Sequence, residues 1–342
     1  MWTAVLLTCS LGLIFVASGL FTNSVEWVGH KLELNEGVVG SVLAAIGTAM
    51  PETLIPIVAI LWVGEEYGDA VGIGAILGAP FMLATLAMFV TGLSVTAFAW
   101  TGRRTRELRV NASVLGRDNR FFFLAYVLAI GAAFLPLHGI KVALAVFVLG
   151  LYVFYVYKHA TDEAEQLVSD TEDMSPLHFH RASEDPRLLL VVAQLAFSLA
   201  IMIGGAYLFV EQVNAFASAN GVPALLLSLL IAPVATELPE CMNSVIWVRQ
   251  GKDTLALGNI TGAMVFQSCI PVAVGLAFGD WTVTPDKVSA FVSAGIAVLA
   301  AGLIFGTLSF GQRKLTSTAL LSGGVFYLLY VGYLVASVIQ QT

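Results

Sequence analysis

Long apolar stretches separated by short polar connections make up most of this chain of 342 residues. One crossing of a hydrocarbon core of roughly 30 Å takes about 20 helical residues. The division between the fourth and fifth stretches, at LPLHGIK, is the weakest. The first stretch could instead be a cleaved signal, but no basic residue precedes it and no clear cleavage site ends it, so a mature helix is favoured. The pattern predicts ten spans, at about 2–21, 38–62, 71–99, 121–137, 140–157, 188–209, 223–248, 254–278, 287–309 and 315–338.

Composition supports an all-α integral membrane protein. Hydrophobic residues are 58% of the chain and charged residues 11%, against roughly 45–50% and 25% in soluble domains. Cys9, Cys241 and Cys269 lie in apolar stretches, so they are interpreted as small core residues and not as a disulfide framework or a zinc cluster. No cofactor is expected. The net charge of -7 is mostly local to 158–187, and nucleic acid is not an expected partner.

The basic residues indicate an orientation. If ten spans are counted, 14 of the 16 lysines and arginines fall in the odd-numbered connections, and only Lys141 and Lys287 fall in the even-numbered ones. Cytoplasmic connections are rich in Lys and Arg. The sequence therefore predicts cytoplasmic odd-numbered connections and two extracytoplasmic termini, and we expect the cell (inner) membrane as the location.

A hydrophilic connection at 158–187 divides the chain into two five-helix halves, 1–157 and 188–342. It holds eight of the 23 acidic residues, together with His178 and His180. These side chains could form a regulatory cation site, but their spacing fits no EF-hand loop. A solvated acidic linker on the cytoplasmic side is favoured.

The two halves contain an internal repeat. Residues 48–52, TAMPE, align with 236–240, TELPE, and one helix later 72–79, GIGAILGA, aligns with 256–263, ALGNITGA. Each later segment contains Gly-x-x-x-Gly, which lets helices approach closely. The equivalent helices are the second and the seventh, which are five crossings apart. Because five is an odd number, these two helices cross the membrane in opposite directions. The sequence thus predicts inverted repeats whose matched centres meet near the midplane, as in many secondary transporters.

Each TxxPE segment places a proline before a glutamate in an apolar helix. Proline has no N–H and its ring displaces the carbonyl four residues earlier, so Pro51 frees the oxygen of Gly47 and Pro239 frees that of Ala235. We expect two kinked helices that offer freed carbonyls beside carboxylates and threonine hydroxyls at one depth. Hard cations such as calcium take six to eight oxygens of this kind.

Three acidic residues lie in these central segments: Glu52, Glu237 and Glu240. An ionised acid at the bilayer centre costs roughly 3 kcal/mol or more, and such residues mark functional sites by default. The alternative is protonated glutamates bonded to helix carbonyls. No Lys, Arg or His lies in the predicted central spans, so a metal cation or protons should balance the charge. Gln267 could add an amide oxygen, or it could make an interhelical hydrogen bond.

In these helices the chain resembles the calcium/cation antiporter superfamily, to which sodium/calcium exchangers belong. The family's repeats read about G-T-S-x-P-E/D and then G-S-N-x-x-N/D, and here they stand as GTAMPE (47–52), ATELPE (235–240), GAPFML (78–83) and GAMVFQ (262–267). The resemblance implies ten inverted-repeat helices with both termini outside. It implies that Glu52 and Glu240 bind calcium, that Thr48 and Thr236 are neighbouring ligands, and that Gln267 replaces the last polar residue of the second repeat.

The chain also departs from the family pattern. A titratable glutamate replaces one serine, so proton coupling competes with sodium coupling, and apolar residues leave sodium fewer ligands. The family's serine positions hold Ala49, Ala79, Glu237 and Ala263, and its asparagine positions hold Pro80, Leu83 and Met264.

These features favour a secondary antiporter that exchanges a divalent cation, calcium before others, for Na⁺ or H⁺ by alternating access. Two alternatives stay open, a passive cation channel and a divalent-binding relative that does not transport. An intramembrane hydrolase is disfavoured, since no Asp dyad, Ser/His pair or His-rich zinc motif is visible, and no enzyme activity is expected. The sequence leaves open the counter-ion, the stoichiometry and the oligomeric state.

Overall fold

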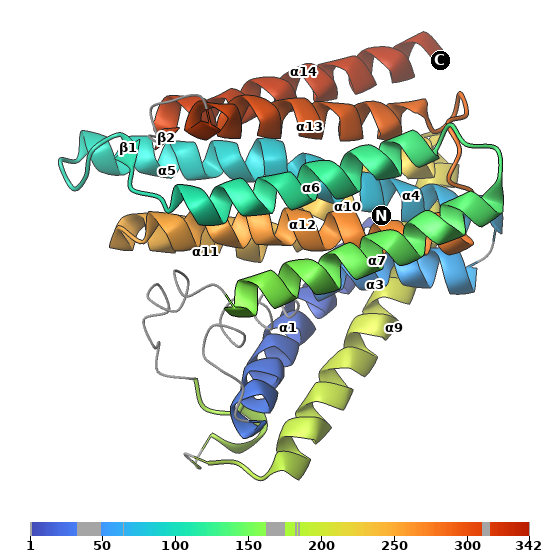
Figure 1. The fold of residues 1–342 in the computed structure, drawn as a ribbon. Coiled ribbons are helices and arrows are strands. Elements are labelled where there is room, and N and C mark those ends of the chain that lie inside the picture. Colours follow the sequence, from blue (N-terminus) through green and yellow to red (C-terminus); the bar gives the residue numbers. More distant parts are fainter. Residues whose placement is uncertain are drawn as a thin grey trace.

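The computed structural model describes residues 2–32, 49–63, 65–161, 175–181, 183, 185–309 and 315–341. Within them the chain is almost entirely helical (Figure 1). In chain order the elements are α1 (Trp2–Lys31), α3 (Met50–Val58), the π-helical η2 (Ala59–Val63), α4 (Glu65–Met82), the π-helical η3 (Leu83–Ala87), α5 (Met88–Trp100), β1 (Glu107–Leu108), α6 (Ala112–Ala132), α7 (His138–Thr161), the 3₁₀ turn η4 (His178–His180), α9 (Leu188–Asn220), α10 (Ala224–Thr236), α11 (Leu238–Gln250), α12 (Asp253–Phe278), α13 (Val288–Ser309), β2 (Leu315–Thr316) and α14 (Ser317–Gln341).

Two helical segments form the centre of the bundle. Among the described residues, seven helices are long and apolar enough to cross a membrane. In the α4–α5 segment 83% of the apolar stretch is buried and in α12 78%, whereas in α1, α7, α9 and α14 the share is 28–33%. The outer helices therefore present large apolar surfaces outward, as a lipid-facing layer does. The predicted all-helical class is confirmed.

Several helix boundaries differ from the predicted spans. α6 begins at Ala112, nine residues before the predicted span, so Arg117 and Asp118 lie inside a helix instead of in a connection. Both are buried, and the Asp118 carboxylate accepts hydrogen bonds from the Tyr155 hydroxyl of α7 (3.1 Å) and the Thr261 hydroxyl of α12 (2.7 Å). The predicted start of the fourth span at residue 121, which left Arg117 in a connection, was therefore wrong. A hydrophobicity pattern places charged residues in connections and cannot show that neighbouring helices bury them.

The TELPE segment breaks its helix instead of kinking it. α10 ends at Thr236 and α11 begins at Leu238, with Pro239 in the first turn of α11 and Glu237 at the junction. In the first half, α3 begins at Met50 with Pro51 in its first turn. Proline is tolerated in a first helical turn because the N–H groups there have no intrahelical partner. The predicted kinks are thus helix starts, and each places a glutamate in a first turn.

At one end of the bundle, several connections contact one another. Arg104 binds Asp253 through two hydrogen bonds of 2.7 and 2.8 Å, which joins the α5–α6 connection to the start of α12. Strands β1 and β2 pair antiparallel, joining the same connection to the start of α14. Lys31 at the end of α1 forms an ion pair with Asp185. We call this the basic end; it lies to the left and lower left in Figure 1.

Three of the even-numbered connections contact one another at the opposite end. The Lys141 ammonium group, at the start of α7, donates to the Trp281 carbonyl (2.7 Å), and the Trp281 indole donates to the Ala129 carbonyl at the end of α6 (2.9 Å). The Asp280 N–H donates to Asp69 near the start of α4 (3.1 Å). Each of these contacts joins connections that the sequence assigned to the same side.

Helices α4 and α10 approach each other at the predicted glycines. A methyl group on Gly74 would overlap the Ser228 hydroxyl and lie 2.6 Å from the Leu225 carbonyl oxygen, and one on Gly78 would overlap the Leu229 carbonyl. The backbones are therefore in contact along this pair. At Gly258 of the second repeat, no described atom lies within 4 Å of such a methyl group.

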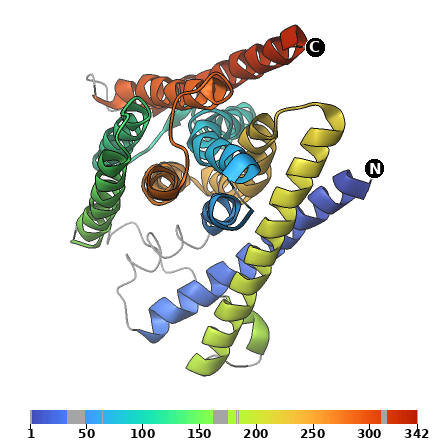
Figure 2. The same cartoon turned by 90° about the vertical axis from the view of Figure 1, so that its right-hand side faces the viewer.

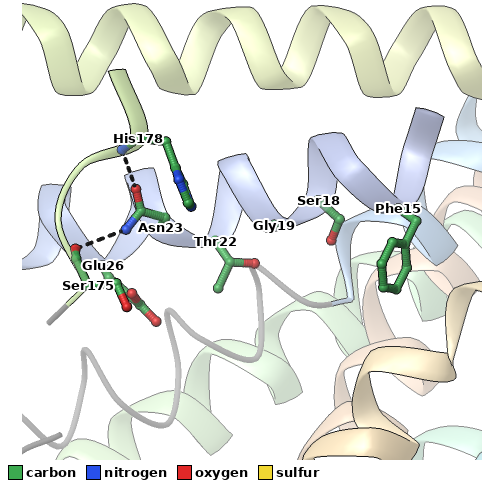
Figure 3. A pocket seen from close by; sticks show the side chains of 8 residues that line it. All are labelled: Phe15, Ser18, Gly19, Thr22, Asn23, Glu26, Ser175 and His178. Carbon is green, nitrogen blue, oxygen red and sulfur yellow. Dashed lines mark hydrogen bonds between the residues drawn. The ribbon is translucent and has the colours of Figure 1, made fainter. Parts of the chain in front are cut away.

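Helices α1 and α9 form a pair that crosses the bundle obliquely (Figure 2). The Gln194 amide of α9 lies 3.0 Å from the Leu20 carbonyl, the Asn23 amide oxygen and the Ser24 hydroxyl of α1. The linker segment 175–181 joins this pair, because the Ser175 carbonyl accepts from Asn23 (3.2 Å) and the Asn23 oxygen accepts from the His178 N–H (3.3 Å; Figure 3). α1, α9 and the linker segment are thus connected by buried polar contacts.

Candidate functional site

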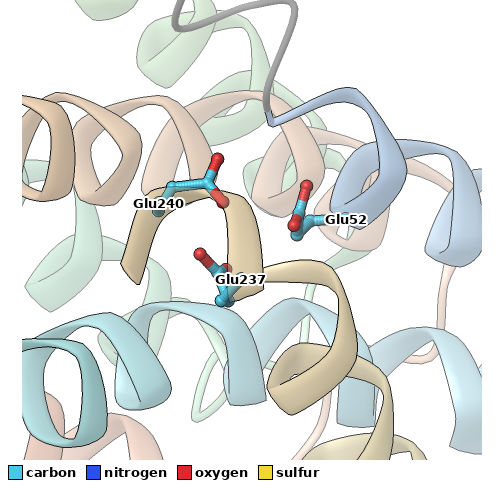
Figure 4. A group of neighbouring side chains, drawn as sticks. All are labelled: Glu52, Glu237 and Glu240. Atoms are coloured by element: carbon cyan, nitrogen blue, oxygen red, sulfur yellow. The ribbon is translucent and has the colours of Figure 1, made fainter. Parts of the chain in front are cut away.

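Three glutamates meet inside the bundle (Figure 4). Glu52 comes from α3, Glu240 from α11, and Glu237 from the junction between α10 and α11. One carboxylate oxygen from each lies within 4.8 Å of the others. They are 4%, 2% and 0% exposed for Glu52, Glu237 and Glu240, so the cluster is closed off from solvent.

Local geometry explains why the three side chains converge. Glu52 and Glu240 each follow a first-turn proline, so each occupies the first turn of its helix. Glu237 has helical backbone angles (φ −81°, ψ 0°) although it lies at the break. Residues three apart in helical conformation share a face, so Glu237 and Glu240 point the same way, toward Glu52.

Gln267 from α12 completes the cluster. Its amide nitrogen donates a 2.7 Å hydrogen bond to one oxygen of Glu237. Among the described residues, both oxygens of Glu52, the second oxygen of Glu237 and the amide oxygen of Gln267 are buried and accept no hydrogen bond. A buried polar oxygen without a partner costs about 1–3 kcal/mol, and more if it is charged. The site thus has ligand capacity that the described side chains leave unused.

The negative charge of the cluster is not balanced by Arg104, Lys141 or Lys287. Two unit charges 4.8 Å apart repel by about 3.5 kcal/mol at an effective dielectric constant of about 20. The partner that the structure shows for Glu237 is an amide, and Arg104, Lys141 and Lys287 bind groups at the two ends of the bundle. Three carboxylates so arranged need a cation or protons between them.

The structure describes two of the other predicted ligands and leaves two outside the described residues. The Thr236 side chain is buried at the end of α10, where its hydroxyl donates to the Ala232 carbonyl (3.0 Å) and keeps its lone pairs available. Ala235 lies in the last turn of α10, and Pro239 carries no N–H to bond its carbonyl. Gly47 and Thr48 lie outside the described residues.

Most of the apolar residues that replace polar residues of the superfamily pattern lie in the core. Ala49, Ala263, Leu83 and Met264 all belong to the main hydrophobic core, and Ala79 is buried. They offer no side-chain oxygen. The polar groups of the site are thus concentrated on α3, the α10–α11 junction and Gln267.

One residue near the site was missed by the sequence reading. The Asn259 amide of α12 donates to the backbone carbonyl of Glu240 (3.4 Å), and one helical turn further along α11 the Ser244 hydroxyl donates to the Ala256 carbonyl (2.9 Å). These bonds hold α11 against α12. The signal available in the sequence was the position of Asn259 between Gly258 and Gly262, which we interpreted only as a packing motif.

Comparison with known proteins agrees with the resemblance seen in the sequence motifs. The sequence profile described as sodium/calcium exchanger protein matches residues 2–158 and 190–339. CaxA of Alkalimonas amylolytica, named as a candidate antiporter, is 26% identical over 94% of both chains. The inner membrane protein YrbG of Escherichia coli (strain K12) is 23% identical over 89% of this chain and 88% of its own, and the sodium/calcium exchanger MaX1 of Methanosarcina acetivorans is 24% identical over 95% and 96%.

Solved structures show the same fold. The crystal structure of the H⁺/Ca²⁺ exchanger CAX superposes with a TM-score of 0.71 at 18% identity, covering 97% of this chain and 82% of the other. The sodium-calcium exchanger NCX_Mj superposes with a TM-score of 0.59 at 18% identity, covering 97% and 98%.

Proposed function

Because the chain belongs to the sodium/calcium exchanger protein family, a family of membrane transporters and not of enzymes, we propose that it is a secondary antiporter that exchanges Ca²⁺ for Na⁺ or H⁺. The observation that carries this proposal is the convergence of Glu52, Glu237 and Glu240 within 4.8 Å inside the bundle. Calcium prefers carboxylate, carbonyl and hydroxyl oxygens, which are the groups gathered here. The names of MaX1 and CAX, as Na⁺/Ca²⁺ and H⁺/Ca²⁺ exchangers, support the same substrate.

In this proposal Glu52 and Glu240 are the principal calcium ligands. Thr236 and the Ala235 carbonyl add oxygens from the end of α10, and Glu237 and Gln267 form a further polar pair beside the ion. The equivalent ligands of the first repeat, Thr48 and the Gly47 carbonyl, remain predictions from the motif. Calcium here is the transported substrate and not a resident cofactor.

Two counter-ions fit the family, and the site favours protons. The apolar residues at Ala49, Ala79 and Ala263 remove hydroxyls that the resemblance assigns to sodium, whereas Glu237 adds a group that can carry a proton. When a divalent ion leaves, three buried carboxylates repel one another, and protons can restore the balance. Sodium remains the alternative to be tested.

The ten-span inverted repeat is part of the proposal. Helix packing supports it, because α12 packs against α3 and the equivalent pair, α5 and α11, is also in contact. The contacts between connections at the two ends support alternating crossings. The two five-helix halves would then be 1–157 and 188–342, joined by the linker at 158–187, with cytoplasmic basic residues and extracytoplasmic termini. The name of YrbG supports the inner membrane as the location.

Alternating access would come from relative movement of the α1–α9 pair and the central bundle. The pair is joined internally by polar contacts at Gln194 and Asn23. Its contact with the bundle is apolar, through Ile14 and Ala17 of α1 against Leu54 of α3. An apolar interface without hydrogen bonds between these side chains can shift at low cost.

Purified protein in proteoliposomes tests the function. We expect Ca²⁺ uptake that saturates and that requires a counter-ion gradient, with loss of flux in Glu52→Gln and Glu240→Gln. Glu211→Gln is the matched control, because Glu211 is an exposed glutamate of α9. Intact flux in both site variants would refute the assignment. Flux without a counter-ion would indicate a channel, and tight binding without flux would indicate a relative that does not transport.

The counter-ion is tested by imposing a proton gradient or a sodium gradient alone. If Glu237 carries the proton, the proton gradient drives uptake, and Glu237→Ser moves the preference toward sodium. Uptake driven only by sodium in the unchanged protein would reject proton coupling.

A further inference from the structure

Asp118 of α6 is a buried carboxylate that the proposed exchange does not use. The residue is 1% exposed. One of its oxygens accepts a hydrogen bond from the Tyr155 hydroxyl of α7 (3.1 Å), and the other accepts from the Thr261 hydroxyl of α12 (2.7 Å). Burying a carboxylate is costly unless hydrogen bonds satisfy it. Through these bonds one side chain joins three neighbouring helices, α6, α7 and α12 (Figure 1).

Thr261 lies on the opposite face of α12 from the residues that contact the glutamate cluster. On that other face, the Gln267 amide donates to Glu237 (2.7 Å) and the Asn259 amide donates to the Glu240 carbonyl (3.4 Å). At 3.6 residues per turn, Asn259 and Gln267 are about 80° apart around the helix, whereas Thr261 is about 120–160° from both. Hydrogen bonds therefore hold α12 on two faces, with the α6 carboxylate on one and the cluster on the other.

The Thr261 hydroxyl has a second acceptor, which lies within its own helix. It is 3.4 Å from the Gly258 carbonyl oxygen, a longer contact than the 2.7 Å to Asp118. A bond inside α12 cannot orient that helix against its neighbours. The bond to Asp118 can, because its acceptor belongs to α6.

The glycines of the two repeats are packed differently. In α4, a methyl group on Gly74 would lie 2.6 Å from a backbone carbonyl oxygen of α10. In α12, no described atom lies within 4 Å of a methyl group on Gly258, and one on Gly262 would be 3.7 Å from the Tyr155 hydroxyl, which is an ordinary contact. Apolar burial is not directional, whereas a hydrogen bond is. On this face of α12, the bond at Thr261 is therefore the contact that resists rotation.

A small rotation of α12 is enough to separate Gln267 from Glu237. A group at the outer radius of a helix, roughly 5–6 Å from its axis, moves by about 2 Å when the helix turns by about 20°. Added to a hydrogen bond of 2.7 Å, this displacement exceeds the limit of about 3.2 Å for a good N–H···O bond. A contact that fixes the rotation of α12 therefore also preserves the bond between Gln267 and Glu237.

We infer that the Asp118–Thr261 hydrogen bond sets the rotation of α12, and that Asp118 and Thr261 are thereby positioning residues for the Gln267–Glu237 pair. The inference rests on the proposed function for its effect on transport. Neither residue touches the ion. When their bond is lost, α12 turns within its apolar contacts and Gln267 withdraws, so Glu237 loses the donor that orients it beside the divalent cation. Loss of groups that orient metal ligands typically weakens metal binding 10- to 100-fold.

Thermal unfolding without divalent ions tests the positioning itself. In detergent solution containing EDTA, Gln267→Leu and Glu237→Gln should change Tm non-additively, because both remove the same bond. In a Thr261→Val background, the non-additive part should fall by more than about half. In a Tyr155→Phe background it should be retained, because this control removes the other hydroxyl from Asp118 and leaves the bond to Thr261. Non-additivity that survives Thr261→Val, or that is absent from the unchanged background, would overturn the inference.

Ca²⁺ transport in proteoliposomes tests the consequence for the site. Thr261→Val should raise the KM for Ca²⁺ about ten-fold, and Thr261→Ser, which keeps the hydroxyl, should restore most of the affinity. Asp118→Ala, which removes the acceptor, should raise the KM to the same extent; if this variant fails to fold, Thr261→Val decides. Tyr155→Phe should change the KM by less than about two-fold, even if its Tm falls as far. Added to Gln267→Leu, Thr261→Val should no longer raise the KM, because the pair that it positions is already absent.

Failure of this inference and failure of the proposed function give different results. Absence of Ca²⁺ flux in the unchanged protein would overturn the antiporter proposal, and the unfolding measurements in EDTA would still decide the positioning. Normal flux with the same KM in Thr261→Val as in Tyr155→Phe would overturn the positioning alone, because both hydroxyls would then have a purely structural role.

Discussion

Replacing Gly74 by alanine tests whether the α4–α10 contact positions the carboxylates. A methyl group at this position lies 2.6 Å from the Leu225 carbonyl oxygen and overlaps the Ser228 hydroxyl. Ordinary contact begins at 3.4 Å, so the two helices must separate by about 0.8 Å. The Leu225 carbonyl is backbone and cannot rotate away, so the movement falls on α10 as a whole.

Two consequences follow from a shift of this size. Overpacking of a close helix contact costs about 1–3 kcal/mol, and a radial gap of 0.5–1 Å loses a quarter to a half of the dispersion energy of the atoms concerned. α10 ends at Thr236, directly before Glu237, so the same shift moves Glu237 relative to Glu52 of α3. Changes in groups that orient metal ligands typically cost 10- to 100-fold in affinity.

Thermal unfolding in detergent and Ca²⁺ titration measure the two effects. We expect Gly74→Ala to lower Tm by about 2–8 °C and to weaken Ca²⁺ binding at least ten-fold. The control is Gly150→Ala on the exposed face of α7, where no described atom lies within 4 Å of the added methyl group. It should leave both quantities unchanged or raise Tm slightly. Unchanged Tm and affinity in Gly74→Ala would refute the close α4–α10 contact as the determinant of site geometry.

Three further variants test other contacts. In a double-mutant cycle by thermal unfolding, Gln267→Leu and Glu237→Gln should show a coupling of about 1–3 kcal/mol for their 2.7 Å bond, and additivity would argue against it. Arg104→Ala should destabilise by about 3 kcal/mol, because it removes both bonds to a buried aspartate, and Asp253→Asn added to it should recover part of the loss. Partial burial raises the pKa of Asp280, but hydrogen bonds from Lys287 and Thr282 outweigh it and hold that pKa below 3.8. Asp280 therefore stabilises the folded protein at pH values above the pKa that its side chain has in the unfolded chain, and this stabilisation is lost as pH falls. The Tm difference between the unchanged protein and Asp280→Asn should thus shrink below about pH 4. A constant difference would contradict this.

The apolar pattern was sufficient for the all-helical membrane class and insufficient for the boundaries of the helices. Span length and basic-residue spacing are set by the bilayer, so they can be predicted without coordinates. The start of α6 could not be predicted from the sequence, because Asp118 is stabilised inside the bundle by hydroxyls of Tyr155 and Thr261 that are distant in sequence. The break at Glu237 was also misjudged, since a proline predicts only the loss of a hydrogen bond and not whether the helix bends or ends.

The carboxylate cluster was predictable because its chemistry is local. A glutamate after a proline in an apolar stretch is costly unless it is used, and two such segments in opposed repeats should meet. The 2.7 Å bond from Gln267 was one of two alternatives that the sequence left open.

The unequal contribution of the two repeats bears on how exchange is coupled. The first repeat supplies Glu52 and places a buried alanine, Ala49, before its proline; the second supplies Glu240 and places Glu237 at the equivalent position. Two carboxylates, one from each repeat, match the charge of one divalent ion. The third is in excess of that charge, and the partner shown for it is the neutral amide of Gln267. Under the proposed exchange, a site built from equal repeats would be balanced by the divalent ion alone, so we propose that the monovalent counter-ion binds on the side of the cluster where Glu237 and Gln267 lie.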